Sequence, residues 1–394
     1  MKRNEDRLKL ENQETLSWSY FIESIGPAAT KETYTFALLN YIKTMGYDLS
    51  NTDTLLEQDH KKTEYNVFRY FSSLNKKGNL SPATLRCRFA AIKQFYTIQP
   101  QGFTDVNWER IRKNYVNKSD IRASPDEPYT YEQISKLLNI ADIRMKVCIY
   151  LMCGAGVRIG AIPTLKYKDI KEIKYENYNL VQLTVYGETN DQYTTFGTPE
   201  LLAAIQNYIQ YRKRYGEELK PNSPLVREQF DISDIEAAKN AKSIAHATIK
   251  THIHKLLYRS GIRKKENIVT KKGERHTNGD GVINSLSHGL RKFYRTQLFN
   301  AEIDPLIAEI LTGHDTGLIG VYTKPTLRQQ LEQFTKAISR LTINEEERQK
   351  VTIERLEAES EKQKTTFLKA LEDRDSRFNR LAAQIEQLNK KLGI

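Results

Sequence analysis

A polar stretch with two prolines, NKSDIRASPDEPYT, occupies residues 117–130 and has no hydrophobic periodicity. Proline and small polar residues disfavour both helices and strands, so this stretch predicts a linker. The chain has 394 residues, which is too long for one ordinary core and fits two or three domains. We therefore expect separately packed regions on the two sides of the linker.

The region before the linker is predicted to be all-helical. Its segment SPATLRCRFAAIKQFYTI repeats apolar residues at helical spacing, and Ser81 followed by Pro82 marks the start of a helix. After the linker, Thr130 with Gln133 opens another helix. Beyond Leu165 the pattern changes to two short strands, NLVQLTVYG and QYTTFGT, before helical patterns resume. The predicted fold class is mainly α with a small antiparallel β-sheet.

The C-terminal tail carries a seven-residue repeat. The first apolar position of the repeat is filled by Leu371, Phe378, Ile385 and Leu392, and the second by Phe367, Leu381 and Leu388. Charged and amide side chains fill the positions between them. This spacing predicts a coiled coil, and self-association is favoured over a lone solvated helix.

The predicted domain organisation has five parts. They are a polar tail at 1–14, a helical domain at 15–117, a linker at 118–128, a mainly helical domain with a small sheet at 129–342 and a coiled-coil tail at 343–394. The formal net charge is +12, and residues 345–394 hold 11 acidic and 11 basic side chains. The excess positive charge therefore belongs to the globular part, which favours a polyanionic partner such as nucleic acid.

Several classes of protein are disfavoured. No apolar run approaches the roughly 20 residues that span a bilayer, and the polar N-terminus does not resemble a leader, so no membrane partner and a cytoplasmic, nucleoid-associated location are expected. The three cysteines lack metal-ligand spacing and predict reduced thiols, with Cys148 and Cys153 buried. His246, His252 and His254 lie among lysines and arginines, which favours a basic helix beside DNA over a metal site. The predicted DNA-binding residues are Lys250, Lys255, Arg263 and Lys264.

Three segments hold residues suited to phosphoryl transfer. They are GAGVRIGAIPTLKYKDI with Arg158, SHGLRKFYRTQ with His288 and Arg291, and LTGHDTGLIGVYTKP with His314 and Tyr322. Paired guanidiniums can hold the non-bridging oxygens of a phosphodiester without a metal, and histidines can handle protons. A tyrosine phenolate can attack phosphorus and later leave again, so the covalent link is reversible.

These segments hold four motifs in order: an arginine box with Arg158, an H-x-x-R box with His288 and Arg291, a Gly-His box with His314, and Tyr322 shortly after it. With these motifs, residues 15–325 resemble the tyrosine recombinase (phage integrase) family. The resemblance implies that 15–117 is a core-binding (DNA-clamp) domain and that 129–342 is the catalytic domain. The resemblance implies that Arg158 and Arg291 bind the scissile phosphate, that His288 and His314 assist, and that Tyr322 forms a 3′-phosphotyrosyl link. It also implies action on double-stranded DNA in a synapse of four protomers, with no cofactor and no metal. Integration or excision of a mobile element is the expected role, and resolution of chromosome dimers or plasmids is the nearest competing role.

The sequence departs from the family pattern at two places. The family carries a general-acid lysine in the hairpin after the first arginine, but here the hairpin reads LTVYGETNDQYTTF, with Glu188 near that place. Lys166, Lys168 and Lys174 remain candidates to replace it. The family also favours an acidic residue where this chain has Ala161.

Two other functions fit the same sequence. One is a DNA-binding structural or regulatory protein that keeps the fold with reduced cleavage. The other is an enzyme resembling type IB topoisomerases, which share the tyrosine nucleophile. Formation of a covalent DNA adduct separates the first of these from a recombinase.

Overall fold

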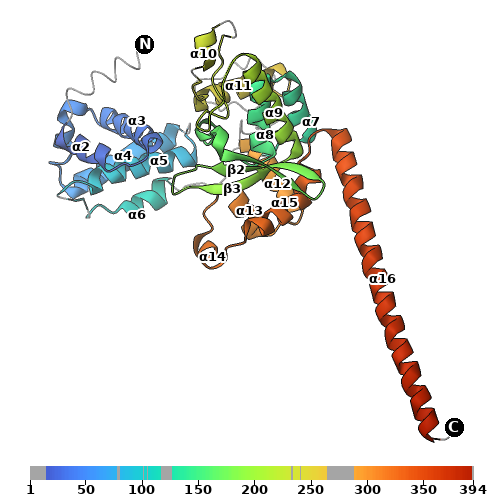
Figure 1. Ribbon diagram of the computed structural model, residues 1–394. Helices are drawn as coiled ribbons and strands as arrows, with labels where there is room; N and C mark the ends of the chain where they lie inside the picture. The colour runs from blue at the N-terminus through green and yellow to red at the C-terminus, as the bar shows by residue number, and fades with distance from the viewer. Residues whose placement is uncertain are drawn as a thin grey trace. The chain divides into compact units, whose positions relative to one another are not determined.

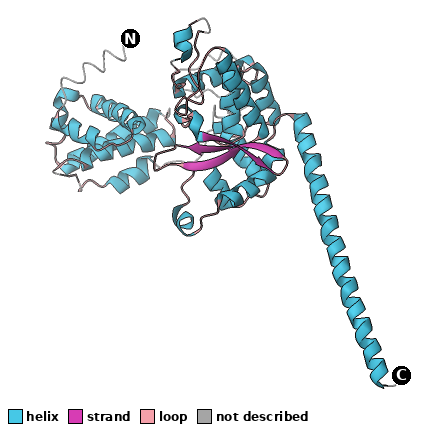
Figure 2. Cartoon of the chain, in the orientation of Figure 1, coloured by secondary structure: helices cyan, strands magenta, loops and turns pink. Residues whose placement is uncertain are grey.

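The computed structural model describes residues 15–77, 80–100, 102–103, 105–116, 127–231, 234–239, 241–263 and 288–392. These residues divide into two compact units, one holding the elements up to η2 and one holding all later elements. The chain is mainly helical with one small antiparallel sheet, so the predicted fold class is confirmed (Figure 2). Of the described helices, none combines the length and the apolar character that crossing a membrane requires.

The first unit is entirely helical where it is described. Its elements are α2 (Leu16–Glu23), α3 (Ala28–Thr44), η1 (Leu49–Leu55), α4 (His60–Lys77), α5 (Pro82–Thr97), α6 (Trp108–Ile111) and η2 (Arg112–Val116). Helix α5 starts where the sequence predicts, because the Ser81 side chain accepts a hydrogen bond from the Thr84 backbone N–H at 3.1 Å. Aromatic rings fill the core, and the hydroxyls of Tyr41 and Tyr96 satisfy each other at 3.0 Å.

The second unit begins with two helices, and most side chains of the second, α8, are buried. Its elements are α7 (Tyr131–Ile140), α8 (Ile143–Cys153), η3 (Ile162–Thr164), η4 (Tyr167–Asp169), β1 (Ile170–Tyr175), β2 (Tyr178–Val185), β3 (Tyr193–Gly197), α9 (Pro199–Arg214), α10 (Ile235–Lys239), α11 (His246–Arg259), α12 (His288–Asn300), α13 (Pro305–Leu311), α14 (Gly317–Tyr322), α15 (Leu327–Leu341) and α16 (Glu345–Leu392). Thr130 and Gln133 form the predicted capping box of α7, with bonds of 3.2 and 3.0 Å. Cys148 and Cys153 lie in α8 and are fully buried, as predicted.

The sheet has the order β1-β2-β3, with both pairs antiparallel. Leu183 on the central strand faces Ile170 on one side and Thr195 on the other, and the buried side chains of β2 belong to the core. Helix α9 contacts β2 and helix α13 contacts β3, and these helices lie on opposite sides of the sheet in Figure 1. Helix α12 packs directly on α8, and the sheet lies between α9 and α13, so the segments that carry Arg158, Arg291 and His314 come close to one another.

Candidate active site

Arg291 connects the three segments that carry the predicted chemistry. It lies on α12 with only 6% of its surface exposed. Its guanidinium donates hydrogen bonds to the carbonyl of Gly156, in the turn after α8, and to the carbonyl of Thr312, after α13, at 2.5 Å in the second case. These bonds fix the orientation of the guanidinium before any ligand arrives.

Arg158 places a second cation beside Arg291. Burial lowers the pKa of Arg291, and the positive charge of Arg158 lowers it further, so the two guanidiniums are close enough to repel each other. Both charges also act on the Tyr193 phenol, whose pKa is raised by burial and lowered by the two arginines. The partners of Arg291 are carbonyl oxygens, an imidazole and the Tyr193 phenol rather than a carboxylate, so its positive charge is available to an anionic ligand.

His314 lies against the same guanidinium. Its Nε2 is 2.9 Å from an Arg291 Nη, and its Nδ1 is 2.5 Å from the Glu309 carboxylate. Because a carboxylate can only accept, Nδ1 carries the proton, and Nε2 then accepts from Arg291. Burial lowers the pKa of His314, the Glu309 hydrogen bond raises it, and the Arg291 charge lowers it again, leaving the pKa below its ordinary value.

Glu309 and Arg295 hold His314 in this orientation, and sequence reasoning did not identify either residue. Arg295 donates to both Glu309 oxygens, at 2.7 and 2.6 Å, in a bidentate ion pair. These bonds from Arg295 lower the pKa of Glu309 to about 2, with a further contribution from His314 against the opposing effect of burial. Spacing was the signal in the sequence that could have identified them. Arg295 follows Arg291 by one helical turn, and Glu309 precedes His314 by five residues, so both lie close in the chain to predicted site residues.

The backbone before His314 is shaped by a close approach to the sheet. Gly313 has φ +60°, and a Cβ at this position would lie 2.4 Å from the ring of Tyr193 on β3. A side chain is therefore excluded both by the left-handed backbone and by the tyrosine ring. The turn brings His314 to the same part of the sheet as the two arginines.

Two predicted residues do not join this cluster in the structure. Tyr322 is the last residue of α14, and 85% of its surface is exposed. His288 is the exposed first residue of α12. Among the described residues, neither side chain forms a hydrogen bond with Arg291 or His314. The structure thus brings together Arg158, Arg291 and His314, with His288 and Tyr322 apart from them.

The hairpin between β2 and β3 has no lysine of its own, but Lys168 of η4 contacts it. Lys168 Nζ is 2.7 Å from Glu188 Oε1, and this hydrogen bond raises the lysine pKa. Lys174 lies opposite Asn179 at the other end of the β1–β2 ladder. Lys168 is the candidate whose ammonium is hydrogen-bonded at the β2–β3 turn, and the charge of Lys166 also helps to lower the pKa of Glu188 there.

The predicted DNA-binding residues lie on or after α11. Lys250 and Lys255 are exposed on this helix, and Arg263 lies close enough to Tyr129 to lower the pKa that burial raises. Lys264 lies outside the described residues. His252 Nδ1 is 2.9 Å from the Thr248 carbonyl, and the His254 ring is 4.9 Å from the Tyr258 ring. Within the described part of the chain, no three His, Cys, Asp or Glu side chains gather as metal ligands.

Replacing Glu309 with Gln should destabilise the protein in a pH-dependent way. A carboxyl whose pKa is depressed from 4.5 to about 2 stabilises the fold above pH 4.5, and this contribution is lost as the pH falls towards 2. The Glu309 side chain is 34% exposed, so solvent screens part of this interaction. We therefore expect the free energy of unfolding to fall by about 1–2 kcal/mol at pH 7. Urea denaturation at pH 7 and at successive values below 4.5 measures this difference.

The matched control is Glu332→Gln, which removes an exposed ion pair with Arg328 on α15. Such surface pairs contribute between zero and about 1 kcal/mol. A Glu309→Gln effect no larger than the control, or one that stays constant down to pH 3, would contradict the assigned network.

Comparison with known proteins identifies similar recombinases. No protein-family model matches the chain. Tyrosine recombinase XerA of Pyrococcus horikoshii is 22% identical over 302 residues, which cover 76% of this chain and 87% of the relative. Tyrosine recombinase XerC of Caldanaerobacter subterraneus is 23% identical over 297 residues, which cover 73% of this chain and 72% of the relative. A crystal structure of XerH site-specific recombinase bound to palindromic difH substrate, a post-cleavage complex, matches with 16% identity, 73% coverage of each chain and a TM-score of 0.48.

The curated relatives align with about three quarters of the chain. The chain carries the arginine, His-x-x-Arg, Gly-His and tyrosine motifs in one order. Three curated proteins named tyrosine recombinases are thus similar to this chain over about three quarters of its length, and this similarity supports an enzyme that transfers DNA strands.

Proposed function

We propose that this chain cuts and rejoins double-stranded DNA through a 3′-phosphotyrosyl intermediate in which Tyr322 is the nucleophile. The Tyr322 hydroxyl gives up its proton to one of the two histidines, His288 or His314, and its oxygen forms a bond to phosphorus while the bond from phosphorus to the 5′-oxygen breaks. The 5′-oxygen takes up a proton and leaves as a hydroxyl. The reverse reaction with another 5′-hydroxyl rejoins the strand, so no external energy source is needed.

The observation that carries this proposal is the pair of guanidiniums. Arg291 is buried, oriented by two carbonyls and close to the charge of Arg158. Two cations that repel each other gain most from a ligand that carries negative charge between them. A phosphodiester attacked in line gathers such charge on its non-bridging oxygens, so this arrangement favours the transition state over the ground state.

The histidines have separate roles in the proposal. The Nε2 of His314 is held at the guanidinium pair, so a phosphate bound there lies within its hydrogen-bonding reach. His288 lies one helical turn before Arg291 and approaches the same phosphate when DNA binds. Tyr322 lies outside the cluster, and in-line attack requires its oxygen within about 3–3.5 Å of phosphorus. Segment 315–326, which carries α14, therefore has to bring the phenol inward in the DNA complex.

The proposed partners are double-stranded DNA and further copies of this chain. Lys250 and Lys255 lie on the exposed side of α11 and are suited to phosphate contacts along the duplex, with Arg263 and Lys264 following in the chain. Strand exchange between two sites requires four active sites, so a tetrameric synapse is the working assembly. Integration or excision of a mobile element is the proposed role.

The direct test is a nicked substrate on which the released strand diffuses away. Wild-type protein should remain attached to the DNA as a complex that resists denaturation. Binding without any covalent complex would favour the DNA-binding structural protein instead.

Lys168 is the proposed general acid for the leaving 5′-oxygen. Its place at the β2–β3 turn, held by Glu188, supports this assignment over Lys174. Lys168→Ala should slow cleavage of ordinary DNA by roughly 10²-fold or more, the usual size of a general-acid contribution. A substrate with sulfur in place of the 5′-oxygen needs no protonation, so it should be cleaved by the variant and the wild type at similar rates.

Lys174→Ala is the matched control, since it removes an exposed lysine from β1 at the far end of the same sheet. Its cleavage rate should equal that of the wild type on both substrates. A Lys168→Ala variant as slow on the sulfur substrate as on ordinary DNA would show that Lys168 acts in some other way.

A further inference from the structure

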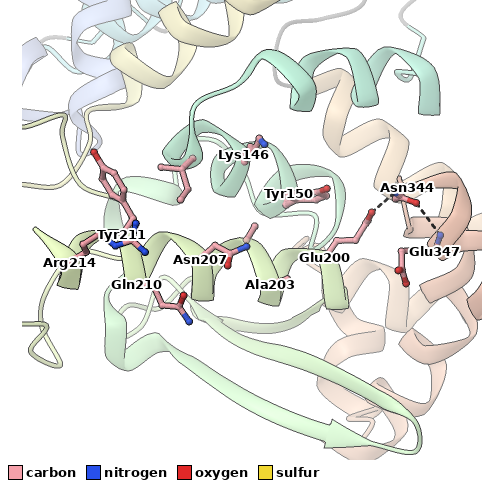
Figure 3. Close-up of a pocket in the computed structure, with 12 residues that line it drawn as sticks. Lys146, Tyr150, Glu200, Ala203, Asn207, Gln210, Tyr211, Arg214, Asn344 and Glu347 are labelled. Atoms are coloured by element: carbon pink, nitrogen blue, oxygen red, sulfur yellow. Dashed lines mark hydrogen bonds between the residues drawn. The ribbon is translucent and has the colours of Figure 1, made fainter.

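Helix α16 is firmly attached to the second unit at its first turns. The Glu200 carboxylate, at the start of α9, accepts hydrogen bonds from the backbone N–H groups of Ile343 and Asn344, both at 2.8 Å (Figure 3). A hollow of about 640 Å³ lies beside this attachment, lined by residues of α8, α9 and the start of α16. The Arg348 guanidinium lies over the Tyr131 ring at 4.2 Å, and Val351 packs on the core. The remaining helix extends beyond these contacts.

The distal part of α16 exposes an apolar stripe. Phe367, Phe378 and Leu381 are 64%, 72% and 57% exposed, and Ile385 and Leu388 follow in the same repeat. Two turns of a straight α-helix take about 7.2 residues, whereas this stripe repeats every seven. The stripe therefore winds slowly around the helix, and a partner helix with the same repeat can stay in contact with it by supercoiling. The tail has equal numbers of acidic and basic residues, so two copies of it meet without net repulsion.

Arg374 determines which way two copies can pair. It occupies the stripe position between Phe367 and Leu381, and its guanidinium contacts the Asp375 carboxylate of its own helix at 3.1 Å. In a parallel in-register pair, the two Arg374 side chains would face each other in the seam and repel. In an antiparallel pair, each arginine instead faces an apolar residue, and its head group stays in water with Asp375.

We propose that α16 pairs with α16 of a second copy in an antiparallel coiled coil. The register that uses the whole stripe sets Phe378 against Leu381 of the other copy at the centre. Moving outward, Arg374 faces Ile385, and Leu371 faces Leu388. The pairing depends only on the tail and goes beyond the proposed cleavage chemistry, so it stands or falls independently of it.

The antiparallel orientation keeps the second units of the two copies far apart. Each α16 runs from Glu345 to the centre of the pair, and at 1.5 Å per residue the two starting points lie roughly 100 Å apart. A parallel pair would hold both starting points about 10 Å apart. The antiparallel pair therefore links protomers bound to well-separated stretches of DNA rather than neighbours on one short site.

Cysteine cross-linking of the full-length chain tests the register. Leu371→Cys and Leu388→Cys variants are prepared separately, mixed under reducing conditions and then oxidised. We expect a disulfide-linked dimer in the mixture and none from either variant alone. Light scattering of the unsubstituted chain should give twice the mass of one chain.

A matched pair on the outer face is the control. Ser376→Cys mixed with Ala383→Cys lies at the same level of the antiparallel pair but points away from the seam, so it should not cross-link. The unsubstituted protein reports any background from the half-buried Cys87. Cross-linking of Leu371→Cys with itself would show a parallel pair, and a single-chain mass would show that the tail has another partner. Either result overturns the proposal.

Discussion

Tyr322→Phe should abolish covalent attachment to DNA while leaving DNA binding almost unchanged. The variant loses only the oxygen that attacks phosphorus, and no other group of a phenyl ring can replace it. Tyr322 is 85% exposed, so its loss removes no contact from the core. We expect no detectable adduct on a nicked substrate, a decrease of at least about 10³-fold, and less than a tenfold change in affinity, since one hydrogen bond contributes about 1 kcal/mol.

Tyr65→Phe provides the control, because Tyr65 is also an exposed tyrosine but lies on α4 in the first unit. It should form the adduct at the wild-type rate. An adduct formed by Tyr322→Phe would assign the nucleophile to another residue. Peptide mapping of the wild-type adduct would then identify that residue.

Arg158→Lys should reduce cleavage far more than affinity. Lysine keeps the positive charge but lacks the planar fork that can hold two phosphate oxygens at once. Loss of one such donor to a developing charge typically slows the reaction roughly 10²–10³-fold. Affinity depends mainly on total charge and should change by less than about tenfold. Single-turnover cleavage and binding at one fixed salt concentration give the two quantities.

Arg158 is a better test of the guanidinium pair than Arg291. Arg291→Lys would also release the carbonyls of Gly156 and Thr312, so a loss of activity could come from the fold. Arg328→Lys, at an exposed position on α15, is the matched control and should leave both quantities unchanged. Equal losses of binding and cleavage in Arg158→Lys would mean that this arginine only positions the DNA.

Local signals in the sequence predicted many of the elements correctly. The caps at Ser81 and Thr130 mark helices that begin at the expected places, because capping depends on residues within one turn. The strand segments before and after the ETND turn become β2 and β3. Strand β1 was not predicted, because half of its sequence IKEIKY is lysine or glutamate, and these residues have a low preference for strands. Helix α15 was also missed, although Thr326 and Gln329 form a capping box at its start.

The candidate site was predictable by residue type but not by geometry. Arg158, Arg291 and His314 were chosen because their chemistry suits a phosphate, and the structure brings these three together. Their distances depend on how α12 and the turn after α13 pack on the sheet, which no local pattern encodes. Glu309 and Arg295 were missed for a related reason. An ion pair across two helices becomes visible only when both helices are in place.

The contact between Gly313 and Tyr193 also restricts how this protein can evolve. Any side chain added at Gly313 meets the tyrosine ring at 2.4 Å and an unfavourable backbone angle. Loss of the ring alone would leave a hollow beside Arg291 and would still not make that backbone angle suit an ordinary residue. The two positions are therefore coupled, and stepwise mutation cannot exchange them one at a time without a poorly packed or strained intermediate. Substitutions in this part of the chain should accumulate around the pair rather than within it.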